Sequence, residues 1–171
     1  MVIKEKEDYR LDKQGGFFVV IVLNESYCPI CQCVLSIRAT RQRVIWEGDT
    51  DAEKGILIIR RLYCEKCARI HHELPDCVVP FKRYSAEVIE NIVDGQAAKD
   101  TPCPDGTARR LRGWWEAVKA YFLCILLTLT EKFGVSFVKP PTFRETVRAA
   151  VNSNNWIFAH QVCTRSASRP G

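Results

Sequence analysis

The sequence predicts an α+β fold in which a small antiparallel zinc-ribbon sheet precedes a helical, helix-turn-helix-like region. Two Cys-x-x-Cys pairs, Cys28 with Cys31 and Cys64 with Cys67, flank segments of β-type sequence, an arrangement typical of zinc ribbons. From Ser85 onward, apolar residues recur at the helical spacing of three or four. We therefore expect three regions: a zinc-ribbon β region over 1–80, a helix-turn-helix-like region with a long helix over 81–134, and a C-terminal helix with a basic tail over 135–171.

Strand patterns surround the cysteine pairs. Residues 17–23 form an unbroken β-branched and aromatic run, which predicts a strand buried on both faces. Residues 34–46 alternate apolar and basic side chains, which predicts a half-exposed strand. A turn that begins at 47–49 and ends at Gly55 leads to a return strand over 56–63, which delivers Cys64 to the metal.

The second half of the chain predicts three helices. Ser85 is placed to cap the first helix, which Gly95 ends, and a connector with two prolines follows over 96–104. The second helix extends to about Lys132, with one apolar stripe made by Leu111, Trp115, Val118, Phe122, Ile125 and Leu129. Residues 142–145 carry the pattern of a capping box, which predicts the start of the third helix.

The two cysteine pairs predict a structural Zn²⁺ site. Two residues between cysteines let a tight turn direct both thiolates at one ion, and two such turns complete a tetrahedron. The predicted ligands are Cys28, Cys31, Cys64 and Cys67. Because so small a sheet buries little apolar surface, we expect the metal to supply stability on the order of 10 kcal/mol.

Two neighbouring residues leave alternative ligand sets open. Cys33 follows Cys31 by two positions, and His71 follows Cys67 by four positions, so either could replace one of the four cysteines. The remaining cysteines have no partner at ligand spacing and are expected to be small buried hydrophobic residues: Cys77, Cys103, Cys124 and Cys163. A redox role of the cysteine pairs is a further alternative.

Enzyme signatures are missing from the sequence. The segment His71-His72-Glu73 contains the His-x-Glu of zinc deaminases, but no Pro-Cys-x-x-Cys follows downstream. A four-thiolate site is also closed and offers no position for a reacting water. No nucleophile elbow, phosphate loop or His-Glu-x-x-His is present. We therefore expect a protein that is not an enzyme and has no small-molecule substrate.

Composition places the chain among ordinary globular proteins. It has 171 residues, of which 47% are hydrophobic and 26% charged, without a run of about 18 apolar residues that would cross a bilayer. The start of the chain lacks the basic and apolar regions of a signal peptide, so we expect a cytoplasmic protein with reduced thiols and no membrane association.

Charge and its placement favour a polyanionic partner. The net charge is +5, and the excess lies in residues 81–171, which carry 13 basic against 8 acidic side chains. Arginines crowd the start of the long helix, where cations oppose the helix dipole unless an anion compensates. A recognition helix presents this end to DNA, although a solvated basic face would show the same pattern. The predicted DNA-binding residues are Lys82, Arg83, Arg109, Arg110 and Arg112.

The stretch from Ile59 to Tyr84, with the segments around Cys28-Pro-Ile-Cys31, 107–114, 152–156 and 164–166, resembles a bacterial family that carries a domain-of-unknown-function label. The resemblance covers most of the chain from about residue 25, and the His-x-Glu-Leu-Pro stretch is its most specific part. It implies a zinc ribbon and helix-turn-helix similar to the N-terminal DNA-binding region of transposases. No activity of the family carries over, and the absence of an acidic catalytic domain implies binding without strand transfer.

These observations together predict a zinc-binding, DNA-binding protein of mobile-element (transposase-like) or regulatory type, without catalytic activity of its own. The alternative is a zinc-ribbon module for protein–protein interaction, which would bind a partner subunit or self-associate.

Overall fold

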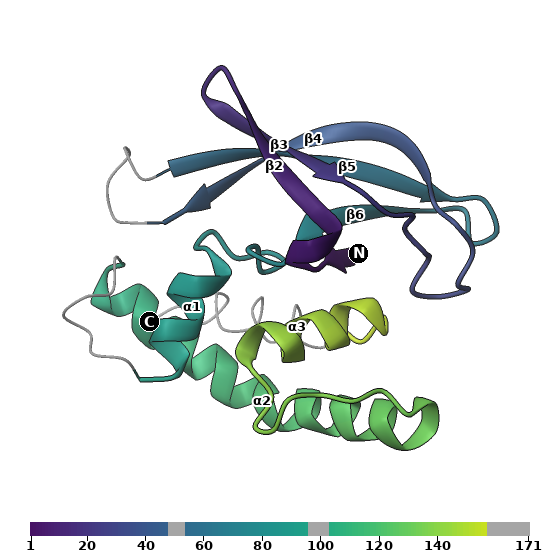
Figure 1. Cartoon of the computed structure of the whole chain (residues 1–171). Coiled ribbons are helices and arrows are strands. Elements are labelled where there is room, and N and C mark those ends of the chain that lie inside the picture. Colours follow the sequence, from purple (N-terminus) through teal and green to yellow (C-terminus); the bar gives the residue numbers. More distant parts are fainter. Residues whose placement is uncertain (48–53, 96–102, 157–171) are drawn as a thin grey trace. The chain divides into compact units, whose positions relative to one another are not determined.

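The computed structural model describes residues 1–47, 54–95 and 103–156, and the chain divides into two compact units, 1–87 and 88–171. Several expectations lie outside the described residues: Gly48 and Asp49 of the predicted turn, most of the 96–104 connector, Cys163, and the tail with the 164–166 segment. Figure 1 shows the elements of both units.

The first unit is built around a sheet. Its strands are β1 (Val2–Lys4), β2 (Tyr9–Gln14), β3 (Phe17–Val22), β4 (Ser36–Trp46), β5 (Lys54–Cys64) and β6 (Arg69–Pro75), with a short 3-10 turn η1 (Lys6–Asp8). Helix α1 (Ala86–Val93) begins at the end of this unit, and α2 (Asp105–Phe133) and α3 (Phe143–Asn152) belong to the second.

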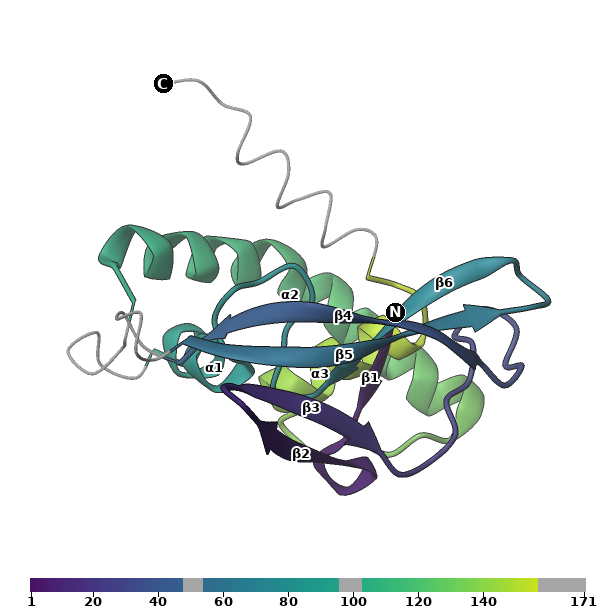
Figure 2. The same cartoon turned by 90° about the horizontal axis from the view of Figure 1, so that it is seen from above.

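The sheet is mixed, which corrects the expectation of a purely antiparallel one. Its order is β1-β6-β5-β3-β2, with β4 paired to β5 off this path. The pairs β1–β6 and β3–β5 are parallel, while β2–β3, β4–β5 and β5–β6 are antiparallel. Figure 2 shows β4 and β5 running side by side, with β3 next to β5. The central strand β5 thus connects every part of the sheet.

The strand over residues 17–22 forms as expected, but it is not buried on both faces. Only Val20 is buried in β3, and the other five residues of the strand are half-buried. Gly15 and Gly16 make the turn to β2 with φ values of +52° and +97°. Positive φ at both central residues is the geometry of a tight hairpin turn, which glycine adopts without steric cost.

A buried carboxylate in β6 is compensated inside the first unit. Glu73 is 1% exposed and accepts a hydrogen bond from the Ser26 hydroxyl. Its other carboxylate oxygen forms an ion pair with Arg60 Nε at 2.5 Å. A buried charge without such partners would be strongly destabilising. The pair therefore links β5, β6 and the segment before the first cysteine turn.

The second unit holds an aromatic cluster between α2 and α3. Trp115 and Phe143 approach to 4.9 Å edge to face, and Phe122 stacks on Trp156 at 5.5 Å. Trp114 contacts both Phe143 and Trp156. Trp114 and Trp115 are therefore both buried in the core of the second unit.

Two of the predicted helix ends follow the expected chemistry. Gly134 ends α2 at φ +65°, and Thr142 and Glu145 form the capping box of α3. Helix α2 has 29 residues, but no helix in the described part of the chain is long and apolar enough to span a bilayer.

The described residues do not show a helix-turn-helix. Residues 94–104 separate α1 from α2. A helix-turn-helix joins its two helices by about three or four residues. The helical period in the sequence therefore predicted the elements, but not their pairing.

Candidate metal centre

The first cysteine turn is a closed loop held by the backbone. Tyr27 pairs with Val34 as an isolated bridge, the Cys28 N–H donates to the Cys33 carbonyl at 2.8 Å, and the Gln32 N–H donates to the Cys28 carbonyl at 2.9 Å. Gln32, directly after Cys31, has φ +59°. This left-handed residue turns the chain back, so both thiols point to the inside of the loop.

The second cysteine turn repeats this geometry at the end of the β5–β6 hairpin. Cys64 ends β5 and pairs with Arg69 of β6. The Cys67 N–H donates to Cys64 Sγ at 3.4 Å, and Ala68, directly after Cys67, has φ +50°. Each turn therefore places a left-handed residue immediately after its second cysteine.

Four sulfurs meet where the two turns face each other. The Sγ atoms of Cys28, Cys31, Cys64 and Cys67 all lie within 4.8 Å of one another. The Cys31–Cys64 and Cys28–Cys67 sulfur pairs are 3.5 and 3.9 Å apart. Around a zinc ion with bonds of about 2.3 Å, tetrahedral geometry places neighbouring sulfurs about 3.8 Å apart. The cluster thus has the dimensions of a tetrahedral four-thiolate site and could hold a metal ion.

The cluster is closed to water on the sheet side. Cys28 and Cys64 have no exposed surface, and Val2, Leu35 and Leu62 pack with them in one hydrophobic cluster. Such surroundings suit a structural metal with all positions filled by protein, since a catalytic ion needs an open position.

The thiols influence one another's ionisation. Burial raises the pKa of Cys28, but hydrogen bonds from the Ile30 and Cys31 amides and from neighbouring thiols outweigh it and lower the value to about 7. Hydrogen bonding to Cys31, together with burial, raises the pKa of Cys67 to about 12. One thiolate forms readily, whereas several at this distance need a cation to neutralise them.

His71 lies behind the cluster and not in it. Its Nε2 is 3.6 Å from Cys28 Sγ, and its Nδ1 is 3.3 Å from the Met1 nitrogen. Burial, the positive charge on that nitrogen and Arg69 lower the pKa of His71 to about 4, so the ring is neutral near pH 7. His71 lies inside β6. A neutral ring in this place can donate a hydrogen bond to Cys28 Sγ, a contact of the kind that orients the ligands of a metal site.

The other cysteines have mixed environments. Cys33 packs against the cluster without joining the set of four, and its carbonyl accepts the Cys28 N–H. Cys103 is buried as expected and Cys77 is half-buried, but Cys124 is exposed, which corrects the expectation. Position 124 lies outside the apolar stripe of α2. This position in the helical repeat was the signal in the sequence that Cys124 would be exposed.

The five residues predicted to bind DNA fall into two groups. Arg109, Arg110 and Arg112 are exposed on the first turns of α2 in the second unit. Two of them have local partners: Arg110 donates to Thr107 Oγ1 and Arg112 Nε donates to the Ile92 carbonyl, each at 3.1 Å.

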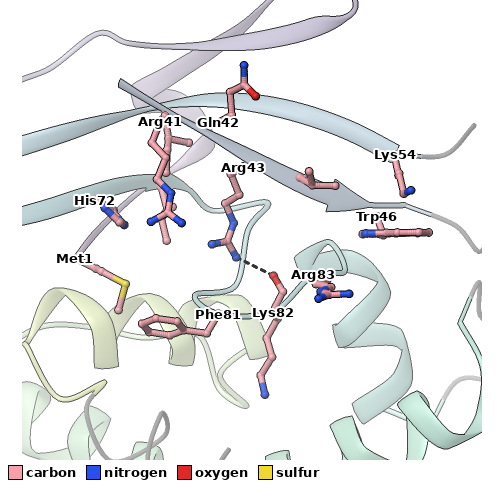
Figure 3. A pocket seen from close by; sticks show the side chains of 13 residues that line it. Met1, Arg41, Gln42, Arg43, Trp46, Lys54, His72, Phe81, Lys82 and Arg83 are labelled. Atoms are coloured by element: carbon pink, nitrogen blue, oxygen red, sulfur yellow. Dashed lines mark hydrogen bonds between the residues drawn. The ribbon is translucent and has the colours of Figure 1, made fainter. Parts of the chain in front are cut away.

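Lys82 and Arg83 lie in the first unit, on the segment between β6 and α1. They line a pocket of about 570 Å³ together with Arg41 and Arg43 of β4 (Figure 3). The sequence analysis did not select the two β4 arginines. Their i, i+2 spacing on a strand, which places them on one face, was the available signal.

Residues 28–111 match the family described as a domain of unknown function (DUF6431). The match contains all four clustered cysteines and the pocket residues Arg41, Arg43, Lys82 and Arg83. No curated protein and no solved structure matches the chain.

Proposed function

We propose that this protein binds DNA and that a structural Zn²⁺ held by Cys28, Cys31, Cys64 and Cys67 stabilises the binding unit. It acts as a mobile-element (transposase-like) or regulatory DNA-binding protein and has no catalytic activity of its own. The tetrahedral spacing of the four sulfurs supports the metal site and is the observation on which the proposal rests.

Zinc is the ion that this ligand set favours. Four thiolates in a tetrahedron suit Zn²⁺ or iron. An iron site would colour the protein, whereas Zn²⁺ is colourless, so elemental analysis and a visible spectrum of purified protein separate the two. One zinc per chain and no visible absorbance is the expected result.

Basic side chains on the first unit support the choice of DNA. Strands β4 and β5 carry five arginines, of which Arg38 and Arg41 are exposed and Arg43, Arg60 and Arg61 are half-buried, and Arg60 is already paired with Glu73. Lys82 and Arg83 add two further cations to the same unit. Arginine forms bidentate contacts to phosphates, and the release of counterions then makes binding salt-dependent.

A salt titration tests this proposal directly. Zinc-loaded protein is titrated with fluorescent duplex DNA of random sequence between low and physiological salt. We expect binding that weakens steeply with salt. The double variant Lys82→Ala/Arg83→Ala should reduce the salt slope by about one to two. Arg109→Ala/Arg110→Ala tests the second group of cations in the same way. No binding at low salt with zinc bound would refute the DNA-binding function.

An apolar groove favours the alternative, a protein-interaction module. It measures about 420 Å³ and is lined by α2 and the segment that follows it, with Leu123 and Leu127 exposed at 37% and 62%. Leu127→Glu should abolish any self-association seen by light scattering. Apolar docking should persist at high salt, which separates it from binding to DNA.

A further inference from the structure

The pocket beside β4 lies entirely within the first unit. Its volume of about 570 Å³ falls in the range of small-molecule sites, about 300–1,000 Å³. Figure 3 shows Arg41 and Arg43 entering it from β4, with Phe81, Lys82 and Arg83 on the facing segment and Trp46 and Lys54 at one end.

Positive charge accumulates around this pocket. Its lining includes Arg41, Arg43, Lys54, Lys82 and Arg83, and none of its described lining residues is acidic. Within the described part of the chain, Arg41 and Arg83 form no ion pair with a carboxylate. Burial and the charges of Arg41 and Arg61 lower the pKa of His72. Burial and Arg41 likewise lower the pKa of Arg43. Cations crowded together in this way attract an anion.

Arg43 holds the facing segment in place. Its Nη2 donates to the carbonyls of Val79 and Lys82, both at 2.8 Å, and its Nε is buried and has no hydrogen-bond partner among the described residues. Phe81 lies between Val79 and Lys82 in the chain, and its φ of +63° is rare for a bulky residue. Such strained positions occur at ligand-binding segments, where surrounding contacts maintain them.

The strained turn presents an aromatic face. Phe81 lines the pocket and is 59% exposed. The other ring, Trp46, already has Lys54 Nζ over its face at 4.3 Å. Because Phe81 lines the pocket and much of its side chain is exposed, its ring offers a planar ligand a stacking surface close to the arginines that would hold an anion.

We propose that this pocket binds a nucleoside phosphate, with Arg41 and Arg83 on the phosphate and Phe81 against the base. The ligand is either a free nucleotide or one nucleotide unit of a single strand, since both present a charged phosphate beside a flat base. This inference goes beyond the proposed function and does not depend on duplex binding.

Calorimetry on the zinc-loaded full chain tests the site with five probes: AMP, adenosine, inorganic phosphate, citrate and a single-stranded deoxyadenosine tetranucleotide. AMP should bind at least tenfold more tightly than adenosine, phosphate or citrate. A tetranucleotide that binds tenfold more tightly than AMP identifies a strand as the source, and equal or weaker binding identifies a free nucleotide. No binding of AMP or tetranucleotide at low salt, or equal binding of all anions, would overturn the proposal.

Two variants and a matched control locate the site. Arg41→Gln should weaken AMP about tenfold, whereas Arg38→Gln, an exposed arginine of the same strand outside the pocket lining, should not change it. Phe81→Asn should weaken AMP but not phosphate, and asparagine tolerates the left-handed backbone, so the fold is preserved. Zinc content and circular dichroism verify folding. Unchanged AMP affinity in both folded variants would refute the assignment, whatever duplex binding shows.

Discussion

Cys28 Sγ and His71 Nε2 lie 3.6 Å apart, although 43 residues separate them in the chain. The contact joins the first cysteine turn to β6, so the sulfur cluster is anchored to the sheet on both sides. His71, which the sequence offered as a possible ligand, therefore contacts one sulfur of the cluster without belonging to the four.

His71→Ala should leave the protein able to bind one zinc, but with an affinity about 10- to 100-fold lower, because an orienting hydrogen bond to a ligand is lost. Competition with a chromophoric chelator measures the change. His72→Ala, one position along the same strand, is the control and should retain the parent affinity. A variant that binds no zinc at all would make His71 a ligand.

Cys31→Ser and Cys33→Ser form a matched pair that tests the ligand set. Cys31 belongs to the four clustered sulfurs and Cys33 does not. We expect loss of stoichiometric zinc in the first variant and full zinc content in the second, measured by elemental analysis. The reverse pattern would show that Cys33, and not Cys31, is the ligand.

Removal of the metal should unfold the first unit and spare the second. The sulfur cluster belongs to residues 1–87, whereas the aromatic cluster around Phe122 has its own buried contacts. After chelation, hydrogen exchange should show lost protection over 57–64 and retained protection over 114–122. Retained protection in both segments would show that the metal is not structural.

Thr142→Ala should destabilise the second unit by about 1 kcal/mol, because the Thr142 hydroxyl accepts the Glu145 N–H at the start of α3. Denaturant unfolding followed by tryptophan fluorescence measures the loss. Thr128→Ala, on the exposed face of α2, is the control and should change stability by no more than about 0.5 kcal/mol. Equal effects would indicate that the capping box contributes nothing.

Local chemistry made much of the fold predictable. The cysteine spacing predicted the cluster, and Gly134 and the Thr142–Glu145 capping box marked helix ends that the structure confirms. Each of these signals lies within a few residues of the turn or helix end that it predicts. The periodicity of α2 likewise identified buried residues, since Leu111, Trp115, Val118, Phe122 and Ile125 are buried, but Leu129 of the predicted stripe is only half-buried.

The sheet order and the pocket were not predictable in this way. Strand β1 has three residues, too few for a periodic pattern, and its parallel partner β6 lies about 70 residues later. In the pocket, Arg43 of β4 donates to the carbonyls of Val79 and Lys82, more than 30 residues later in the chain. A single sequence carries no signal for such a contact.

The parallel pairing of Val2 with Glu73 has a consequence for biosynthesis. On a ribosome that adds about 5–20 residues per second, β1 emerges several seconds before the strand that it must join. Before β6 follows, the β2–β3 hairpin and the first cysteine turn leave the exit tunnel, with apolar side chains and the thiols of Cys28, Cys31 and Cys33 uncovered. The nascent chain is therefore most vulnerable to aggregation and oxidation before β6 has been made.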